Sequence, residues 1–145
     1  MKLTDLAILD WVLINNTPHR IQAIDSIDAE ILADDELYYV GEDRCHSEDK
    51  IEGIPLTPEI LEKNGFYDSY TKRYYKRFGS YVCFDIAISL VYKEIEVSKV
   101  CDAGTDCEEV EYGSSIVFGN DICVHTLQHA LRLCGLNELA DNFKV

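Results

Sequence analysis

Residues 81–92 alternate between apolar and mixed side chains, and this alternation is the strongest strand pattern in the sequence. Successive side chains of a β-strand point to opposite faces of the sheet, so an alternating segment directs one face to the core. The predicted core face carries Val82, Phe84, Ile86, Ile88, Leu90 and Tyr92. A sheet with such a face has to be covered by a second layer.

Residues 70–78 are the predicted antiparallel partner of this strand, because Gly79-Ser80 suits a hairpin turn with glycine first. The partner strand mixes cations with aromatics, at Lys72, Arg73, Tyr75, Lys76 and Arg77. Such a mixture can stack nucleobases and hold phosphates. The alternative is a strand whose cations pair with acids across the sheet. The formal net charge of −14 favours this alternative, because binding to a nucleic-acid backbone needs Lys and Arg.

Residues 121–134 predict the helix that covers the sheet. Its apolar side collects Val124, Leu127, Ala130, Leu131 and Cys134. Asn120 or Asp121 can cap its start, and Gly135 can end it. The opposite side carries His125, Gln128, His129 and Arg132, which we expect to face solvent, a partner or a pocket.

His125 and His129 stand one helical turn apart, a spacing that lets two imidazoles share a metal ion. The zinc-protease motif His-Glu-x-x-His needs a glutamate as general base, and this chain has Thr126 at that position. Arg132 on the same side would repel a cation, and the sequence identifies no third ligand. A metal-dependent hydrolase that uses these histidines is therefore an alternative. The leading prediction has no catalytic residue and no cofactor.

A short helix is predicted at 57–64, where Thr57 can cap the start, Pro58 suits the first turn and Gly65 can end the helix. The predicted fold class is α+β: an antiparallel, partly barrelled sheet with this short helix and the longer C-terminal amphipathic helix (about 121–134) packed on it. One domain, 1–145, is expected, with a strand meander at about 6–40, the capped helix at 57–64, a central hairpin at 70–92 and the C-terminal helix at 121–134.

The acidic composition limits the possible partners. It argues against nucleic acid and against an anionic membrane surface, and no segment of the sequence has the apolar length of a membrane span. Without a recognisable signal peptide, we expect a cytoplasmic protein whose six cysteines are reduced. Eleven acids between Asp25 and Glu52 raise a further alternative, an acidic decoy of a nucleic-acid-binding site.

Two blocks of the sequence resemble a family of short uncharacterised proteins of Bacteroides-type gut bacteria, their phages and mobile elements. The first is residues 53–66, Gly-Ile-Pro-Leu-Thr-Pro-Glu-Ile-Leu-Glu-Lys-Asn-Gly-Phe, and the second is residues 124–131, which fits a closing Val-His-x-Leu-Gln block. The family has no assigned activity, so the resemblance implies no site residue. It implies a phage- or mobile-element-associated accessory protein. The leading function is thus a non-enzymatic interaction protein that binds a protein partner or forms a homo-oligomer.

Overall fold

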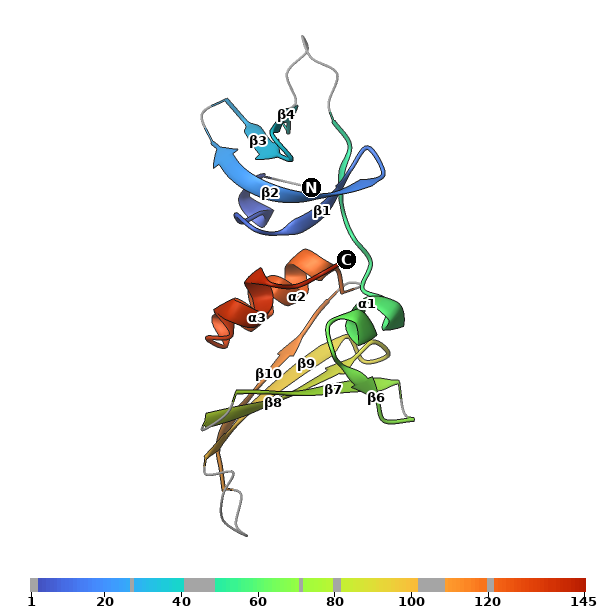
Figure 1. The fold of residues 1–145 in the computed structure, drawn as a ribbon, viewed down its shortest axis with the longest axis vertical. Coiled ribbons are helices and arrows are strands. Elements are labelled where there is room, and N and C mark those ends of the chain that lie inside the picture. Colours follow the sequence, from blue (N-terminus) through green and yellow to red (C-terminus); the bar gives the residue numbers. More distant parts are fainter. Residues whose placement is uncertain are drawn as a thin grey trace.

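The computed structural model describes residues 3–26, 28–40, 49–70, 72–79, 82–101, 109–119 and 122–145, and of residues 101 and 109–112 only the backbone. These residues form two antiparallel five-stranded sheets with helices between them (Figure 1). The predicted α+β class is confirmed. The expectation of a single, partly barrelled sheet is wrong, because the strands divide between two sheets and neither sheet closes.

The N-terminal sheet has the strand order β4-β3-β2-β1-β5. Its strands are β1 (Trp11–Ile14), β2 (Thr17–Asp25), β3 (Glu30–Ala33), β4 (Glu36–Tyr39) and β5 (Ile51–Gly53). Two tight turns join its first four strands in pairs: Asn15 and Asn16 have φ of 51° and 68°, and Asp34 and Asp35 have φ of 50° and 64°. Consecutive left-handed residues match the right-handed twist of the strands that they join, and Asn and Asp tolerate this conformation.

The segment before β1 is not a strand, although the predicted strand meander began at about residue 6. A 3-10 helix, η1 (Leu3–Asp5), is followed by a turn in which Leu9 has φ of 71°. The Asp10 backbone N–H donates to the carbonyl of Ala7, and the Asp10 carboxylate accepts the Ala7 N–H at 2.8 Å. This reciprocal pair holds the turn, so pairing in the sheet begins at Trp11.

The C-terminal sheet has the order β10-β9-β8-β7-β6. Its strands are β6 (Tyr67–Asp68), β7 (Arg73–Phe78), β8 (Val82–Ser89), β9 (Glu94–Cys101) and β10 (Glu109–Val117). The predicted hairpin is present as β7 and β8. However, β8 ends at Ser89, whose hydroxyl accepts the Tyr92 N–H at 3.1 Å, and Tyr92 is 76% exposed instead of in the core.

The first helix, α1 (Pro58–Lys63), is the predicted short helix. The Thr57 hydroxyl accepts the Ile60 N–H at its start, and Gly65 follows its end with φ of +78°. Glycine is favoured at this position because a left-handed residue strains a Cβ.

The C-terminal helical region has two helices. α2 (Val124–Leu133) begins later than predicted, with Cys123 as its N-cap; the proposed caps Asn120 and Asp121 lie outside the described residues. α3 (Asn137–Asp141) was not predicted. It continues an apolar surface formed by Leu136, Leu139, Ala140 and Phe143, all of which are buried.

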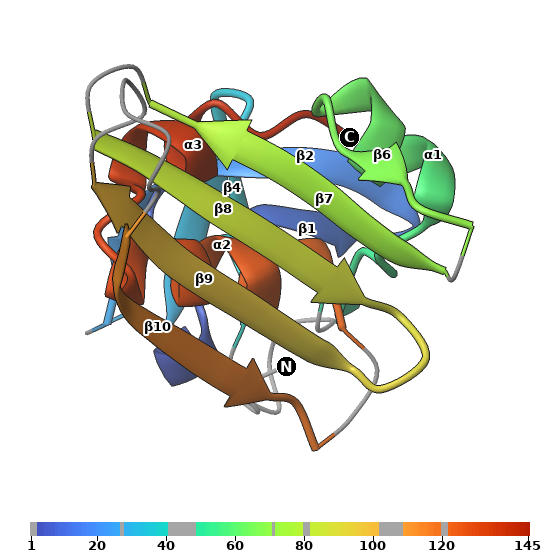
Figure 2. The same cartoon turned by 90° about the horizontal axis from the view of Figure 1, so that it is seen from below.

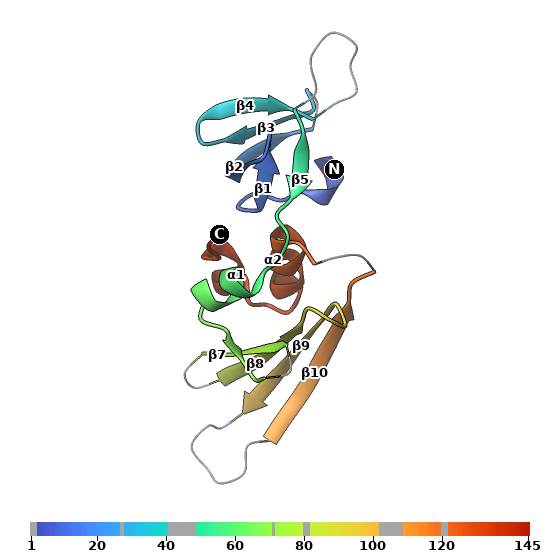
Figure 3. The same cartoon turned by 90° about the vertical axis from the view of Figure 1, so that its right-hand side faces the viewer.

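Helices α2 and α3 lie between the two sheets, and α1 flanks the C-terminal sheet (Figures 1 and 3). The larger core joins the inner face of the C-terminal sheet to all three helices; Ile86, Ile88, Ile95, Leu127 and Leu131 are fully or almost fully buried there. A separate core lies within the N-terminal sheet, around Val12, Ile14, Ile21 and Ile31. Within the described ranges, no helix has the length and apolar character needed to cross a membrane.

Candidate functional site

The polar side of α2 faces the N-terminal sheet. Its apolar side holds the larger core as predicted. The opposite side was expected to face solvent, a partner or a pocket, and of these three, open solvent is wrong for the residues at its centre. Gln128 is fully buried, and His125 is 6% exposed. The N-terminal sheet covers these residues, so α2 has a sheet on each side (Figure 1).

Gln128 is bonded on both ends of its amide. Its Oε1 accepts the Trp11 backbone N–H at 3.0 Å, and its Nε2 donates to the carbonyls of Leu9 at 3.0 Å and Ala140 at 2.9 Å. One side chain thus joins α2 to the N-terminal sheet and to α3. Because buried polar groups need partners, this arrangement satisfies both polar atoms of the amide within the fold.

Asp10 is the other buried polar residue of this contact, with an exposed fraction of 0%. Its carboxylate accepts hydrogen bonds from His129 Nε2 at 2.7 Å and from Arg132 Nη1 at 2.7 Å. Burial alone would raise the pKa of Asp10, but the bonds to His129, Arg132 and the Ala7 N–H outweigh it and hold the pKa below its usual value. Arg132 also pairs with Asp141 at 3.0 Å. These charges therefore stabilise the contact between the layers.

His125 differs from its neighbours because its Nδ1 is buried and finds no hydrogen-bond partner among the described residues. Burial lowers the pKa of His125, so the ring is neutral near pH 7. Its ring meets that of His129 edge-on at 6.1 Å between centroids. His125 and His129 line an open depression of about 720 Å³, together with Asp5, Ile51, Glu52, Gly53 and Thr126.

The weak metal site predicted at His125 and His129 has no cluster of ligands around it. His129 Nε2 is bonded to Asp10. In the part of the chain that the structure describes, no group of three His, Cys, Asp or Glu side chains gathers so that it could hold a metal ion.

A second candidate lies on the outer face of the C-terminal sheet, the face turned away from the helices (Figure 2). The strand register aligns its side chains in rows. One row runs Tyr67, Tyr75, Ala87, Glu96, Ser115, and the next runs Arg77, Asp85, Ser98, Gly113. We call these nine residues the outer rows. The tyrosines stand on β6 and β7, the charged residues Arg77, Asp85 and Glu96 stand on β7, β8 and β9, and the small residues Ala87 and Ser98 lie beside them on β8 and β9.

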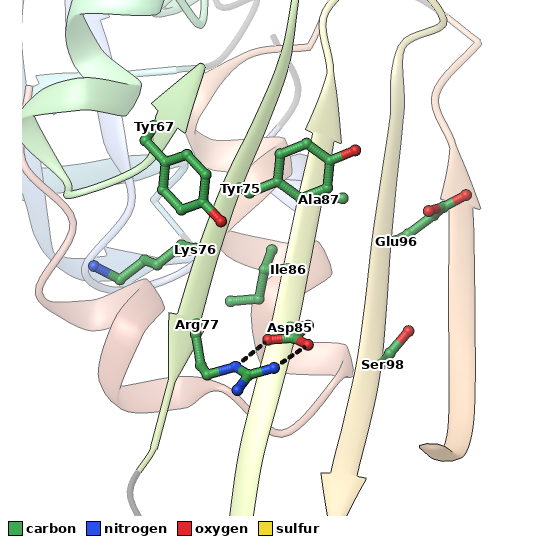
Figure 4. Close-up of a pocket in the computed structure, with 9 residues that line it drawn as sticks. All are labelled: Tyr67, Tyr75, Lys76, Arg77, Asp85, Ile86, Ala87, Glu96 and Ser98. Carbon is green, nitrogen blue, oxygen red and sulfur yellow. Dashed lines mark hydrogen bonds and ion pairs between the residues drawn. The ribbon is translucent and has the colours of Figure 1, made fainter. Parts of the chain in front are cut away.

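This pattern of side chains makes a hollow of about 320 Å³ across β6 to β9 (Figure 4). Tyr67 and Tyr75 stand beside each other with ring centroids 6.1 Å apart, and Ala87 forms the low centre between Tyr75 and Glu96. A second hollow of about 220 Å³ shares Glu96 and Ser98 and continues to Gly113 and Ser115 on β10. The two hollows together cross most of the sheet.

The two arginines of β7 pair with acids across the sheet, which is the alternative that net charge favoured. Arg77 makes a two-bond contact with Asp85 at 2.7 and 2.8 Å, and this contact lowers the pKa of Asp85 (Figure 4). Arg73 pairs with Glu96, and its guanidinium lies 5.7 Å from the centroid of the Tyr75 ring.

Of the two lysines of the predicted basic strand, Lys76 belongs to the lining of the hollow beside Arg77, but its ammonium group points elsewhere. Lys76 lies on the other face of the strand, where its Nζ donates to the Asn64 carbonyl at 2.7 Å and lies 5.7 Å from the Phe66 ring centroid. Lys72 is an exposed residue that precedes β7, with φ of 56°. Sequence reasoning missed Tyr67, Glu96 and Ser98 as members of the face, because only the strand register brings them beside Tyr75.

Comparison of the chain with protein-family models, with curated proteins and with solved structures found no match.

Proposed function

We propose that the chain is a non-enzymatic interaction protein and that the outer rows of the C-terminal sheet bind its protein partner. The observation that carries this proposal is the pair of adjoining hollows on a sheet face that no described element covers. The resemblance of residues 53–66 and 124–131 supports a setting as an accessory protein in the cytoplasm of a gut bacterium or its prophage.

The composition of the hollows suits a protein partner. Tyrosine is enriched at protein interfaces because its ring buries a large apolar area while its hydroxyl remains able to hydrogen-bond. Tyr67 is 64% exposed and stands at the margin of the larger hollow. The small side chains of Ala87 and Ser98 leave space for a side chain of the partner. Binding energy at interfaces concentrates where a side chain fills a pocket in this way.

The charges of the outer rows support a contact of specific shape and mixed polarity. Arg77 and Asp85 hold each other in place, and Glu96 is held by Arg73, which lies beside the outer rows. A partner that meets these groups encounters side chains whose positions are already fixed, so less conformational entropy is lost on binding. Because both signs are present and paired, the surface has no excess of cations to attract a nucleic-acid backbone.

The polar side of α2 gives less support to an enzyme. Gln128, His129 and Arg132 are occupied by contacts with the N-terminal sheet and α3, and they hold the fold together. The acidic-decoy alternative relies in part on the acids at 42–48, which lie outside the described residues. Of the acids between Asp25 and Glu52 that the structure describes, Asp34 is paired with His19 at 2.8 Å.

A photo-crosslinking side chain at position 67 tests the proposal. Benzoylphenylalanine would replace Tyr67 in cells that naturally make the chain, and a matched variant would carry it in place of Tyr92, an equally aromatic and exposed residue of the β8–β9 turn. We expect one defined adduct from position 67 and none from position 92. A second change, Tyr75→Ala, should abolish the adduct without altering the melting temperature by more than a few degrees.

The mass of the adduct identifies the partner and distinguishes a second copy of this chain from another protein. The proposal is wrong if position 67 gives no more adduct than position 92, or if Tyr75→Ala leaves the adduct unchanged while the protein remains folded.

A further inference from the structure

Cys123 lies at the N-terminus of α2 and takes part in its cap. The Cys123 backbone N–H donates to the Thr126 hydroxyl at 3.0 Å, and in return the Cys123 side chain receives the Thr126 backbone N–H. The first amides of a helix favour negative charge, so a sulfur bonded there is held where a thiolate would be stabilised. Cys123 is only partly buried, whereas Cys83 is 4% exposed.

The Cys123 thiol and the His125 ring both approach Gly53 closely. A Cβ on Gly53 would lie 2.6 Å from Cys123 Sγ and 2.8 Å from His125 Cε1, so both groups occupy the space that any other residue would fill. Hydrogen bonds between main chains fix this approach: the Val124 N–H donates to the Ile54 carbonyl at 2.9 Å. The backbone of Gly53 and the start of α2 are therefore held together, and both side chains reach the space beside Gly53.

His125 supplies the second, independent observation. Its side chain is more than nine-tenths buried, yet Nδ1, which is bonded to the Cε1 atom beside Gly53, has no hydrogen-bond partner in the described chain. Leaving a buried polar atom unpaired costs free energy, and such an atom calls for an explanation in function or in a bound molecule. A neutral imidazole nitrogen in this state is able to accept a proton.

The geometry points to Cys123 and His125 as a thiol–imidazole pair that makes Cys123 the site of covalent modification by a small carbon electrophile. The open depression lined by Gly53, His125 and Thr126 gives such a molecule access to this region. The sulfur forms a bond to the electrophilic carbon, and the leaving group departs with its electron pair. The thiol proton passes through one water to His125, whose Nδ1 is not directly bonded to the thiol, and then to solvent. No oxidation or reduction takes place.

Alkylation by iodoacetamide tests this pair in the intact chain. Here an S–C bond forms, the C–I bond breaks and iodide leaves. The rate at each cysteine would be followed by mass spectrometry with peptide fragmentation, and Cys134, near the other end of α2, serves as the internal reference. We expect Cys123 to react at least roughly tenfold faster than Cys134 at pH 7.5, a lower bound that stays below the roughly 10²–10⁴-fold contributed by a well-positioned general base.

Two variants distinguish activation of Cys123 by His125 from activation by the N-terminus of α2. His125→Asn keeps the approximate shape and removes the proton acceptor, and Gly53→Ala places a methyl group between the two side chains. Each should lower the Cys123 rate by roughly tenfold and leave the Cys134 rate unchanged. The wild-type rate should rise with pH through a single transition that His125→Asn shifts, although Asp5, Asp10 and His129 also act on this ring.

The unmodified protein alone is able to overturn the proposal: if wild-type Cys123 reacts no faster than Cys134, the thiol is not activated. If Cys123 is fast but His125→Asn leaves its rate unchanged, the helix terminus acts alone and the pair is refuted. An increase in the Cys134 rate would reveal unfolding of a variant. The ratio of the Cys123 rate to the Cys134 rate in the wild-type protein would then decide whether the thiol is activated. None of these outcomes bears on the crosslinking at Tyr67.

Discussion

Oε1 of Gln128 accepts the Trp11 backbone N–H at 3.0 Å, so a helix side chain binds the first amide of β1. A hydrogen bond between residues this far apart in the sequence joins the two ends of the chain. Together with the Asp10 carboxylate, it makes the polar side of α2 the place where the N-terminal sheet attaches. Mutation of this buried contact should therefore affect stability far more than mutation of the exposed outer rows.

Replacing Gln128 with alanine should strongly destabilise the protein. The change leaves the Trp11 N–H and the carbonyls of Leu9 and Ala140 without the partner that they have now. Unpaired buried groups cost about 1–3 kcal/mol each, and entry of water will offset part of this, so we expect a loss of about 3 kcal/mol. Urea denaturation followed by circular dichroism measures it. Glu138→Ala, on the exposed side of α3, is the matched control and should change stability by about 0.5 kcal/mol or less.

Asp10 should make stability depend on pH in the acid range. Its pKa is lower in the folded chain than in the unfolded chain, so the unfolded state takes up the proton first as the pH falls. The contribution of Asp10 is complete above about pH 5 and is lost as the pH falls through about 3.9 toward the lower folded value. Asp10→Asn should cost about 3 kcal/mol at pH 7, because it removes the charge that pairs with Arg132.

The measurement for Asp10 is the free energy of unfolding between pH 3 and 7 for wild type and Asp10→Asn. The difference between the two proteins should shrink toward low pH. A difference that stays constant over this range would show that the Asp10 charge adds nothing to the contact.

His125 should act in a different pH window. Burial lowers its pKa, so the unfolded chain binds a proton near pH 6.5 while the folded ring remains neutral. Stability from this group is therefore full above about pH 7 and declines as the pH falls through about 6.5. His125→Asn should flatten the stability profile between pH 7.5 and 5.5. NMR titration of the ring should give a pKa below 6.5 in the folded protein; a value at or above 6.5 would contradict the buried neutral ring.

The Arg77–Asp85 pair should contribute little to stability, despite its two hydrogen bonds. Both side chains are 45% exposed, and solvent screens an ion pair at the surface. Arg77→Ala should change the free energy of unfolding by about 0.5 kcal/mol or less, in contrast to the buried charge at Asp10. Chemical denaturation of the two variants side by side checks this ranking, and a large loss for Arg77→Ala would mean that the outer rows serve the fold instead of a partner.

Local signals in the sequence were sufficient for α1 and for one side of α2. Thr57 and Gly65 act within a few residues of the helix they delimit, so their effect is readable without knowledge of the fold. The apolar side of α2 follows from helical spacing alone. Its start was wrong by a few residues because Cys123, which is not a usual cap, occupies the position.

The surroundings of the polar side of α2 could not be read from the sequence. A helical wheel separates apolar from polar residues, but it does not distinguish water from a second layer that supplies polar partners. Gln128 and Arg132 are satisfied by Leu9, Asp10 and Trp11, far away in the chain, so their burial depends on long-range contacts. The helix α3 is too short to show periodicity, and its apolar residues are recognisable only once Leu127 and Leu131 are seen in the same core.

The outer rows could be predicted from the sequence only in part. Alternation places Arg73, Tyr75 and Arg77 on one face of β7, and the acidic composition correctly favoured pairing. The identity of the partners depends on the register of β8 and β9, because a shift by one residue would turn Asp85 and Glu96 to the other face. Sequence reasoning therefore predicted the kind of interaction but not the hollow.

Trp11 is the single tryptophan of the chain, and its indole N–H donates to the Phe143 carbonyl at 2.8 Å. The N-terminal sheet thus contacts the last residues of the chain through the one side chain that dominates intrinsic fluorescence. If the sheet and the helices separate while each retains its own core, the indole enters water and its emission changes before the far-ultraviolet circular dichroism does. The protein consequently contains its own optical probe for whether its two cores unfold together.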